Sequence, residues 1–335
     1  MKQLSKHFLL LFAVLAMGAC SSDGGDIPSS VEEPETVLVS LNMGGEISVE
    51  HENMTRAATN DVYGINVYYD KESDGVVDDL YGYGVFSDPD KMIIALLASH
   101  KYIFKCTMVK NGKNTLYYDA AKVAYPFQTN SSVTSTITNE FTLGTSTYLS
   151  GIGSGKVHLS SQTSPSSSNA TSYASVNRFY GESDTYTPTV GGSVTIALKR
   201  VIFGAKFIIN GVEGGTVTAS CGDFWSYSTT TDYEGTETIY SFVDSHDAWL
   251  NETPLNATLS LKFDSDKGGD WDLTNSQTIS FKRNVMTTVT INVSPDLSSA
   301  SFSITEEEFG EDNNIYIGID GDTIVETEVN PEEEE

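Results

Sequence analysis

Residues 193–209 read SVTIALKRVIFGAKFII, and this stretch holds the strongest strand pattern in the chain. In its first half Val194, Ile196 and Leu198 fall on one side, the period-two pattern of a half-buried strand. Its second half, residues 201–209, is almost continuously apolar. The basic pair Lys199-Arg200 interrupts the two halves, which indicates a turn or a crossing between two sheets.

Strand patterns of the same kind recur on both sides of this stretch. Gly, Ser, Thr and Tyr are abundant, and long segments with helical periodicity are nearly absent. Short strands separated by turn signals are typical of β-sandwiches rather than of alternating strands and helices. We therefore predict an all-β chain with strands at residues 36–49, 62–69, 80–86, 101–110, 216–220, 238–243, 255–263, 278–281 and 286–293, and a long surface loop at 160–176.

The charge of the chain is strongly negative and unevenly distributed. Its 335 residues carry 46 Asp and Glu against 19 Lys and Arg, a net charge of −27. This balance argues against a nucleic-acid partner. Thirteen carboxylates follow Ile304 without a single Lys or Arg, so we expect residues 301–335 to form an acidic, solvated C-terminal extension.

The N-terminus has the pattern of an export signal. Lys2 and Lys6 precede an apolar run at residues 8–16, and the segment ends in Gly-Ala before Cys20. Residues 1–19 are thus predicted to be a signal peptide, too short to span a bilayer. A cysteine at this place can accept a diacylglyceryl group and acyl chains such as palmitate, so Cys20 predicts an outer-membrane lipoprotein at the cell surface.

The segment at residues 20–56 follows as a polar tether and then a strand. Its apolar positions alternate, with the apolar face formed by Val37, Val39, Leu41 and Met43. Arg56 is the only basic residue between Cys20 and Lys71. A trypsin-like protease would therefore have one place to cut in this part of the chain.

Four features, taken in order, resemble the fimbrillin family, the lipoprotein-precursor subunits of type V pili in Gram-negative anaerobes. They are the lipidation signal followed by a strand and Thr55-Arg56-Ala57, the early core strand at 65–70, the apolar-Lys-Arg-apolar segment at 196–207, and the Arg-Asn hairpin within 279–291. The resemblance covers residues 1–295. It implies two transthyretin-like Greek-key β-sandwich domains, which we assign to residues 57–209 and 210–300.

The resemblance also implies a mechanism of assembly. Cleavage between Arg56 and Ala57 would remove the strand of Val37, Val39, Leu41 and Met43, and a strand of another pilin subunit would replace it. Such a replacement restores the backbone ladder at an open sheet edge. The donor could be residues 314–319, which alternate; an extra edge strand or a solvated tail remains the alternative for this stretch. The product would be an adhesive fimbria that meets host or bacterial surfaces.

One acidic loop has the spacing of a calcium site. Asp70, Glu72, Asp74 and Asp78 fall at positions 1, 3, 5 and 9 of such a loop, with a glycine at position 6. Position 12 is Tyr81 instead of a bidentate glutamate. A hairpin turn without metal explains the same residues, and we read the similar acidic stretch at 264–270 as a turn. No other cofactor is expected.

The remaining reactive residues do not indicate an enzyme. The five histidines fall singly, and no nucleophile elbow or phosphate-binding loop is present. Cys106 and Cys221 could form a disulfide after export, but two buried thiols are the favoured interpretation.

The alternative function is an uncleaved surface lipoprotein that acts as a glycan- or protein-binding module or as a pilus anchor. Trp225, Trp249 and Trp271 could stack on sugar rings, although aromatic residues more often fill cores. Residues 322–324, Asp-Thr-Ile, resemble an O-glycosylation acceptor. The accessibility of Arg56 distinguishes the two functions.

Overall fold

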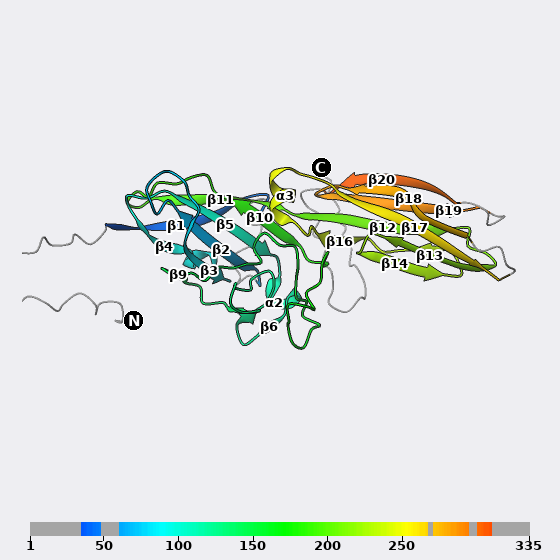
Figure 1. Cartoon of the computed structure of the whole chain (residues 1–335), viewed down its shortest axis with the longest axis horizontal. Helices are drawn as coiled ribbons and strands as arrows, with labels where there is room; N and C mark the ends of the chain where they lie inside the picture. Colours follow the sequence, from blue (N-terminus) through cyan, green and yellow to red (C-terminus); the bar gives the residue numbers. More distant parts are fainter. Residues whose placement is uncertain (1–34, 48–59, 267–270, 295–299, 310–335) are drawn as a thin grey trace, which may run out of the picture. The chain divides into compact units, whose positions relative to one another are not determined.

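The computed structural model describes residues 35–47, 60–266, 271–294 and 300–309, and the side chains within these ranges except at 271–276 (Figure 1). Nearly all of these residues lie in strands or in the loops that join them. The helical elements are short: η1 (Pro89–Lys91), α2 (Gly112–Thr115) and α3 (Ser245–Leu250). The chain is therefore an all-β protein, as the sequence predicts.

The largest sheet has the strand order β4-β1-β11-β10-β5-β2-β3-β9. It joins the first predicted strand to segments far along the chain, and most of its strands have one buried face. Its strands are β1 (Thr36–Gly45), β2 (Val62–Tyr69), β3 (Asp79–Phe86), β4 (Ile93–Leu97), β5 (Tyr102–Val109), β9 (Phe141–Leu143), β10 (Arg178–Glu182) and β11 (Ser193–Arg200).

Two further sheets form the sandwich of the later part of the chain. One has the order β15-β12-β19-β20, with β16 also paired to β12, and the other has the order β14-β13-β17-β18. Their strands are β12 (Ile202–Asn210), β13 (Gly215–Cys221), β14 (Trp225–Thr229), β15 (Tyr233–Glu234), β16 (Thr238–Ser241), β17 (Leu255–Ser265), β18 (Trp271–Phe281), β19 (Val285–Val293) and β20 (Ala300–Glu308).

A small third unit of three short strands lies between β5 and β10 in the sequence. It consists of β6 (Tyr118–Asp119), β7 (Lys122–Val123) and β8 (Ser135–Thr136). Residues 160–176 contain no strand, as predicted, and are largely exposed.

The stretch at residues 193–209 changes sheet at its centre. β11 alternates strictly between exposed and buried residues up to Leu198 and belongs to the eight-stranded sheet. β12 begins directly after Val201 and pairs only with β15, β16 and β19 among the described strands. The predicted crossing at Lys199-Arg200 is confirmed. The sheet therefore changes at Val201, upstream of the domain boundary at 210 that the sequence predicted, and the two-domain partition itself stays a prediction.

Two hydrophobic cores accompany these sheets. Apolar side chains of β1, β2, β4, β5 and β11 form one cluster, which includes Val39, Ile65 and Phe104. A second cluster gathers β12, β13, β17 and β19 around residues such as Phe203. Burial of this apolar surface is the main favourable free-energy term for folding.

Arg178 of β10 is a fully buried cation. Its guanidinium donates to Thr107 Oγ1 at 2.9 Å and to the backbone carbonyls of Gly151, Ile152 and Ser154. Burial lowers the pKa of Arg178 to about 9. The side chain thereby holds the loop at 151–154 against the sheet, because carbonyls lost from water need a donor.

The acidic C-terminal extension expected from residue 301 begins as a strand. β20 pairs with β19 along its whole length, from Ala300 opposite Val293 to Glu308 opposite Val285. Its outer residues, which include Glu306 to Glu308, are exposed. The part of the extension from 310 onward lies outside the described residues.

Candidate functional site

The predicted removable strand, β1, is inserted between two other strands (Figure 1). Its first half, Thr36 to Ser40, pairs antiparallel with β4. Its second half, Ser40 to Gly45, pairs in parallel with β11, opposite Ser193 to Leu198. β1 is thus an internal strand of the sheet, and without it β4 and β11 would each face an empty position.

The side chains of β1 alternate as the sequence predicts. Val37, Val39 and Leu41 are buried in the core, and Met43 is partly buried against it. On the opposite face Leu38 is 67% exposed. The apolar face of β1 therefore fills a channel of the sandwich core, while its other face meets solvent.

β1 ends in a turn that fits closely against β11. Gly45 has φ +81°, and a Cβ at this position would lie 2.5 Å from the carbonyl oxygen of Leu198. Only glycine adopts this backbone conformation so close to another strand without strain. The next residue, Glu46, donates its backbone N–H to the same carbonyl oxygen at 2.9 Å.

The Glu46 carboxylate lies in a cluster of charges contributed by distant parts of the chain. Its Oε2 accepts the backbone N–H of Arg200 at 2.7 Å, and Arg283 Nη1 donates to both carboxylate oxygens at 2.9 and 3.1 Å. Arg283 also donates to the carbonyl oxygen of Arg200 and to Glu252 Oε1. Lys199 Nζ lies 3.2 Å from the same Glu252 oxygen.

Arg283 is largely shielded from water within this cluster, whereas the Lys199 side chain is 39% exposed. The Arg283 side chain is 13% exposed and the Glu46 side chain 38% exposed. Lys199 and Arg283 lower the pKa of Glu252. We name Glu46, Lys199, Arg200, Glu252 and Arg283 the strand-end cluster. It ties the end of β1 to the hairpin between β18 and β19.

The sequence did not predict the strand-end cluster. Arg283 and Asn284 carry only the pattern of a hairpin motif, and Glu46 falls within the strand predicted at 36–49. Their separation of 237 positions leaves no local pattern to detect. The signal that the sequence does hold is the positive pair Lys199-Arg200 at the sheet crossing, where a carboxylate partner is needed.

Several predicted site residues lie outside the described part of the chain. These are Cys20 with its proposed lipid, the processing residues Arg56 and Ala57, the candidate donor at 314–319, and the glycosylation signal at 322–324. Their roles stay predictions. Residues 48–59, which contain Arg56, follow β1 and Glu46 closely in the sequence.

The acidic loop between β2 and β3 does not gather its carboxylates. Asp70 is buried, and its Oδ1 accepts the backbone N–H of Lys101 at 2.6 Å. Glu72, Asp74 and Asp78 are exposed. Within the described residues no group of three or more His, Cys, Asp or Glu could hold a metal ion. Calcium binding stays a prediction, and the geometry gives Asp70 a role in fixing the hairpin.

Cys106 and Cys221 are free and buried, so the favoured interpretation of two buried thiols is confirmed. Burial raises the pKa of the Cys221 thiol to about 12 and raises that of Cys106 as well. Such thiols are poor nucleophiles and poor metal ligands at neutral pH, because both reactions need the thiolate.

The tryptophans whose side chains are described pack against other aromatic rings. Trp225 stacks on Phe207 with ring centroids 3.8 Å apart, and Trp249 contacts Tyr180 edge to face. The side chain of Trp271 lies outside the described set. The more exposed aromatic residue of this region is Tyr227, which stacks on Tyr233 at 3.8 Å.

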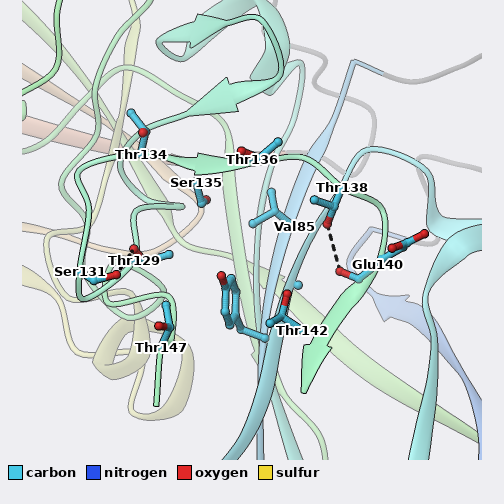
Figure 2. Close-up of a pocket in the computed structure, with 12 residues that line it drawn as sticks. Val85, Thr129, Ser131, Thr134, Ser135, Thr136, Thr138, Glu140, Thr142 and Thr147 are labelled. Carbon is cyan, nitrogen blue, oxygen red and sulfur yellow. Dashed lines mark hydrogen bonds between the residues drawn. The ribbon is translucent and has the colours of Figure 1, made fainter. Parts of the chain in front are cut away.

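A hollow of about 400 Å³ lies beside β3, where hydroxyl-bearing side chains face one another (Figure 2). Tyr83, Val85 and Glu140 contribute to its wall. The sequence does not predict it, because its residues come from β3, β8, β9 and the loops around them, with no shared pattern. Its serine and threonine residues are Thr129, Ser131, Thr134, Ser135, Thr136, Thr138, Thr142 and Thr147.

The helices in the described ranges include none long and apolar enough to cross a membrane. No family model matches the sequence, and no curated protein matches it.

Solved structures with a similar chain path do exist. One is a protein of Bacteroides thetaiotaomicron described as a candidate adhesin, with 11% identity, a TM-score of 0.37, and 84% of this chain and 100% of that chain covered. Another is the fimbrial anchor protein Mfa2 of Porphyromonas gingivalis (11% identity, TM-score 0.33, 82% and 97% covered). A fimbrial assembly protein of Parabacteroides distasonis is similar at 12% identity and a TM-score of 0.31, with 82% and 99% covered. These identities and scores are too low to carry an argument about function.

Proposed function

We propose that the chain is the structural subunit of a cell-surface fimbria, made as an outer-membrane lipoprotein anchored through Cys20. Cleavage between Arg56 and Ala57 frees β1, and a strand of another pilin subunit takes its place. The polymer that results supports adhesion to host or bacterial surfaces. Nucleic acid and catalysis have no part in this function.

The observation that carries the proposal is the position of β1. It is an internal strand whose apolar face fills the core, yet only residues 46–61 separate its end from the next strand, β2. A cut in this connection would leave β1 bound by noncovalent contacts alone. An incoming strand of similar pattern could then restore both backbone ladders.

The small number of arginines and the burial of most of them make a cleavage test specific for Arg56. The sequence has four: Arg56, Arg178, Arg200 and Arg283. Arg178 and Arg200 are buried, and Arg283 is 13% exposed. An arginine-specific protease should therefore cut the folded chain from Ser21 onward after Arg56.

The experiment treats this chain with such a protease and follows intact mass and native gels. We expect one cut and then a ladder of oligomers, with neither in the Arg56→Ala variant. The variant Lys71→Ala is the matched control and should behave as the wild type. Assembly of the uncut chain, or a cut chain that stays monomeric with β1 retained, would refute the proposal.

The hydroxyl-lined hollow favours a second candidate, an uncleaved surface lipoprotein that binds a glycan. Its many hydroxyl groups and Glu140 suit the hydroxyl groups of a neutral sugar. Glycan-array binding that is lost in Thr136→Val and Thr142→Val, but kept in Thr195→Val, would support this function. Thr195 lies exposed on β11, outside the hollow.

A further inference from the structure

Glu46 caps the crossing from β11 to β12 and is supplied by the strand that cleavage would release. The backbone ladder between β1 and β11 ends at Gly45 opposite Leu198. Beyond that point the Glu46 carboxylate accepts a hydrogen bond from the backbone N–H of Arg200 and two from the Arg283 guanidinium. A charged contact therefore follows the end of the backbone ladder, next to the buried apolar residue Ile47.

Removal of β1 would change the charge balance of this corner. The strand-end cluster joins two cationic side chains, Lys199 and Arg283, and the backbone N–H of Arg200 to two carboxylates, Glu46 and Glu252. Loss of Glu46 leaves these two cationic side chains with one carboxylate, and the Arg200 backbone N–H without its acceptor. Arg283 would keep Glu252 and the carbonyl oxygen of Arg200, but both its contacts with Glu46 would be lost. Charge-assisted hydrogen bonds of this kind are costly to leave unmade where water is largely excluded.

We call the position between β4 and β11 that β1 fills the groove. We propose that the end of this groove nearest Arg200 is a carboxylate-recognition site, so that a replacing strand must bring an acidic side chain to Arg283 and the Arg200 backbone N–H. This inference rests on the proposed strand exchange and adds its specificity. Apolar alternation alone would then be insufficient in a donor. An acidic residue just beyond the apolar positions sets where along the groove the strand stops.

The occupant is residues 310–322 of a second copy of the chain. Ile315, Ile317 and Ile319 alternate in the manner of the buried face of β1. Acidic pairs stand on both sides of this run, Glu311-Asp312 before it and Asp320 and Asp322 after it. A carboxylate therefore reaches the cationic end of the groove whichever direction the segment takes.

Peptide competition tests the site with a known register. The chain from Ser21, cut after Arg56, is mixed with excess labelled peptide of residues 35–47, and binding is followed by fluorescence anisotropy. The uncut chain, whose groove is filled, is the blank. The test peptide carries Glu46→Gln. The control peptide carries Glu35→Gln, which removes the same charge at the exposed opposite end.

We expect the Glu46→Gln peptide to bind about tenfold more weakly than the wild type, which corresponds to about 1.4 kcal/mol. The Glu35→Gln peptide should bind within about twofold of the wild type, since an exposed single charge contributes little. The tenfold difference should shrink in high salt.

A protein variant isolates the cationic side of the site. Arg283→Gln should remove the preference for Glu46, whereas Lys282→Gln should keep it. Lys282 is the neighbouring residue and loses the same charge, but its ammonium contacts Glu306. Circular dichroism of both variants checks the fold.

The possible outcomes separate the two proposals. Equal binding of the Glu46→Gln and wild-type peptides overturns the carboxylate site while leaving strand exchange intact. No binding by any peptide overturns the groove, and the carboxylate site with it. A peptide of residues 310–322 that fails to compete where the 35–47 peptide succeeds overturns the assignment of the occupant.

Discussion

Val39→Ala tests whether β1 is held mainly by its buried face. Val39 is fully buried at the centre of β1, and the change removes two methyl groups. Each buried carbon contributes about 0.8 kcal/mol, and the cavity left behind adds to the loss. We expect the free energy of unfolding to fall by about 2 kcal/mol. The matched change Leu38→Ala, one residue away on the exposed face, should cost less than about 0.5 kcal/mol.

The same pair of variants can be compared after cleavage at Arg56. Urea unfolding of the intact chain gives the stability change, and mass spectrometry of the cut chain gives the rate at which the fragment ending at Arg56 is released. A loss of about 2 kcal/mol corresponds to release up to about thirtyfold faster for Val39→Ala. Equal rates for Val39→Ala and Leu38→Ala would refute the reasoning, because the buried face would then contribute no more than the exposed one.

Two further changes test buried polar groups. Arg178→Met should lower the free energy of unfolding by about 3 kcal/mol, since the carbonyl oxygens of Ile152 and Ser154 lose the hydrogen bonds that Arg178 donates. The control Lys122→Met, at an exposed position, should change it by less than about 0.5 kcal/mol. Equal losses for the two variants in urea melts would contradict this role of Arg178. The pKa of Cys221 rises from its ordinary value of 9.0 to about 12 in the fold. Its contribution to stability is therefore complete below about pH 9 and is lost as the pH rises, because the unfolded thiol ionises first. Between about pH 8 and about pH 10 the free energy of unfolding, measured in urea melts, should fall by about 1.4 kcal/mol more for the wild type than for Cys221→Ala. Arg178 titrates in both proteins, so its opposite effect cancels in this comparison. Parallel pH dependences of the two proteins would contradict the prediction.

The elements that the sequence predicted well are those with a local pattern. Alternation along residues 36–43 and 193–198 is sufficient to assign both strands and their buried faces, because period two allows no other arrangement of the apolar side chains. The basic pair Lys199-Arg200 correctly indicated the sheet crossing. The domain boundary near 210 was drawn from the end of the apolar run, where no pairing information exists.

The features that the sequence did not predict depend on contacts between distant segments. Glu46 and Arg283 carry no local signal for each other, since an ion pair requires only proximity in the fold. The acidic loop has the spacing of a metal-binding loop, and in the fold the backbone N–H of Lys101 donates to Asp70; calcium binding there stays a prediction. The spacing of carboxylates along a loop shows only that they could converge on one ion. Contacts with neighbouring segments, which the spacing does not contain, determine where each side chain lies.

The staggered pairing of β1 has a kinetic consequence. Thr36 to Ser40 are paired with β4 and Ser40 to Gly45 with β11, so the two halves of the strand have different neighbours and can open one at a time. An incoming strand can pair with β4 or β11 along one half while β1 stays paired along the other half. The rate of replacement would then rise with the concentration of the incoming strand, because β1 need not dissociate completely first. The rate of fibre growth would be set by binding of the next copy.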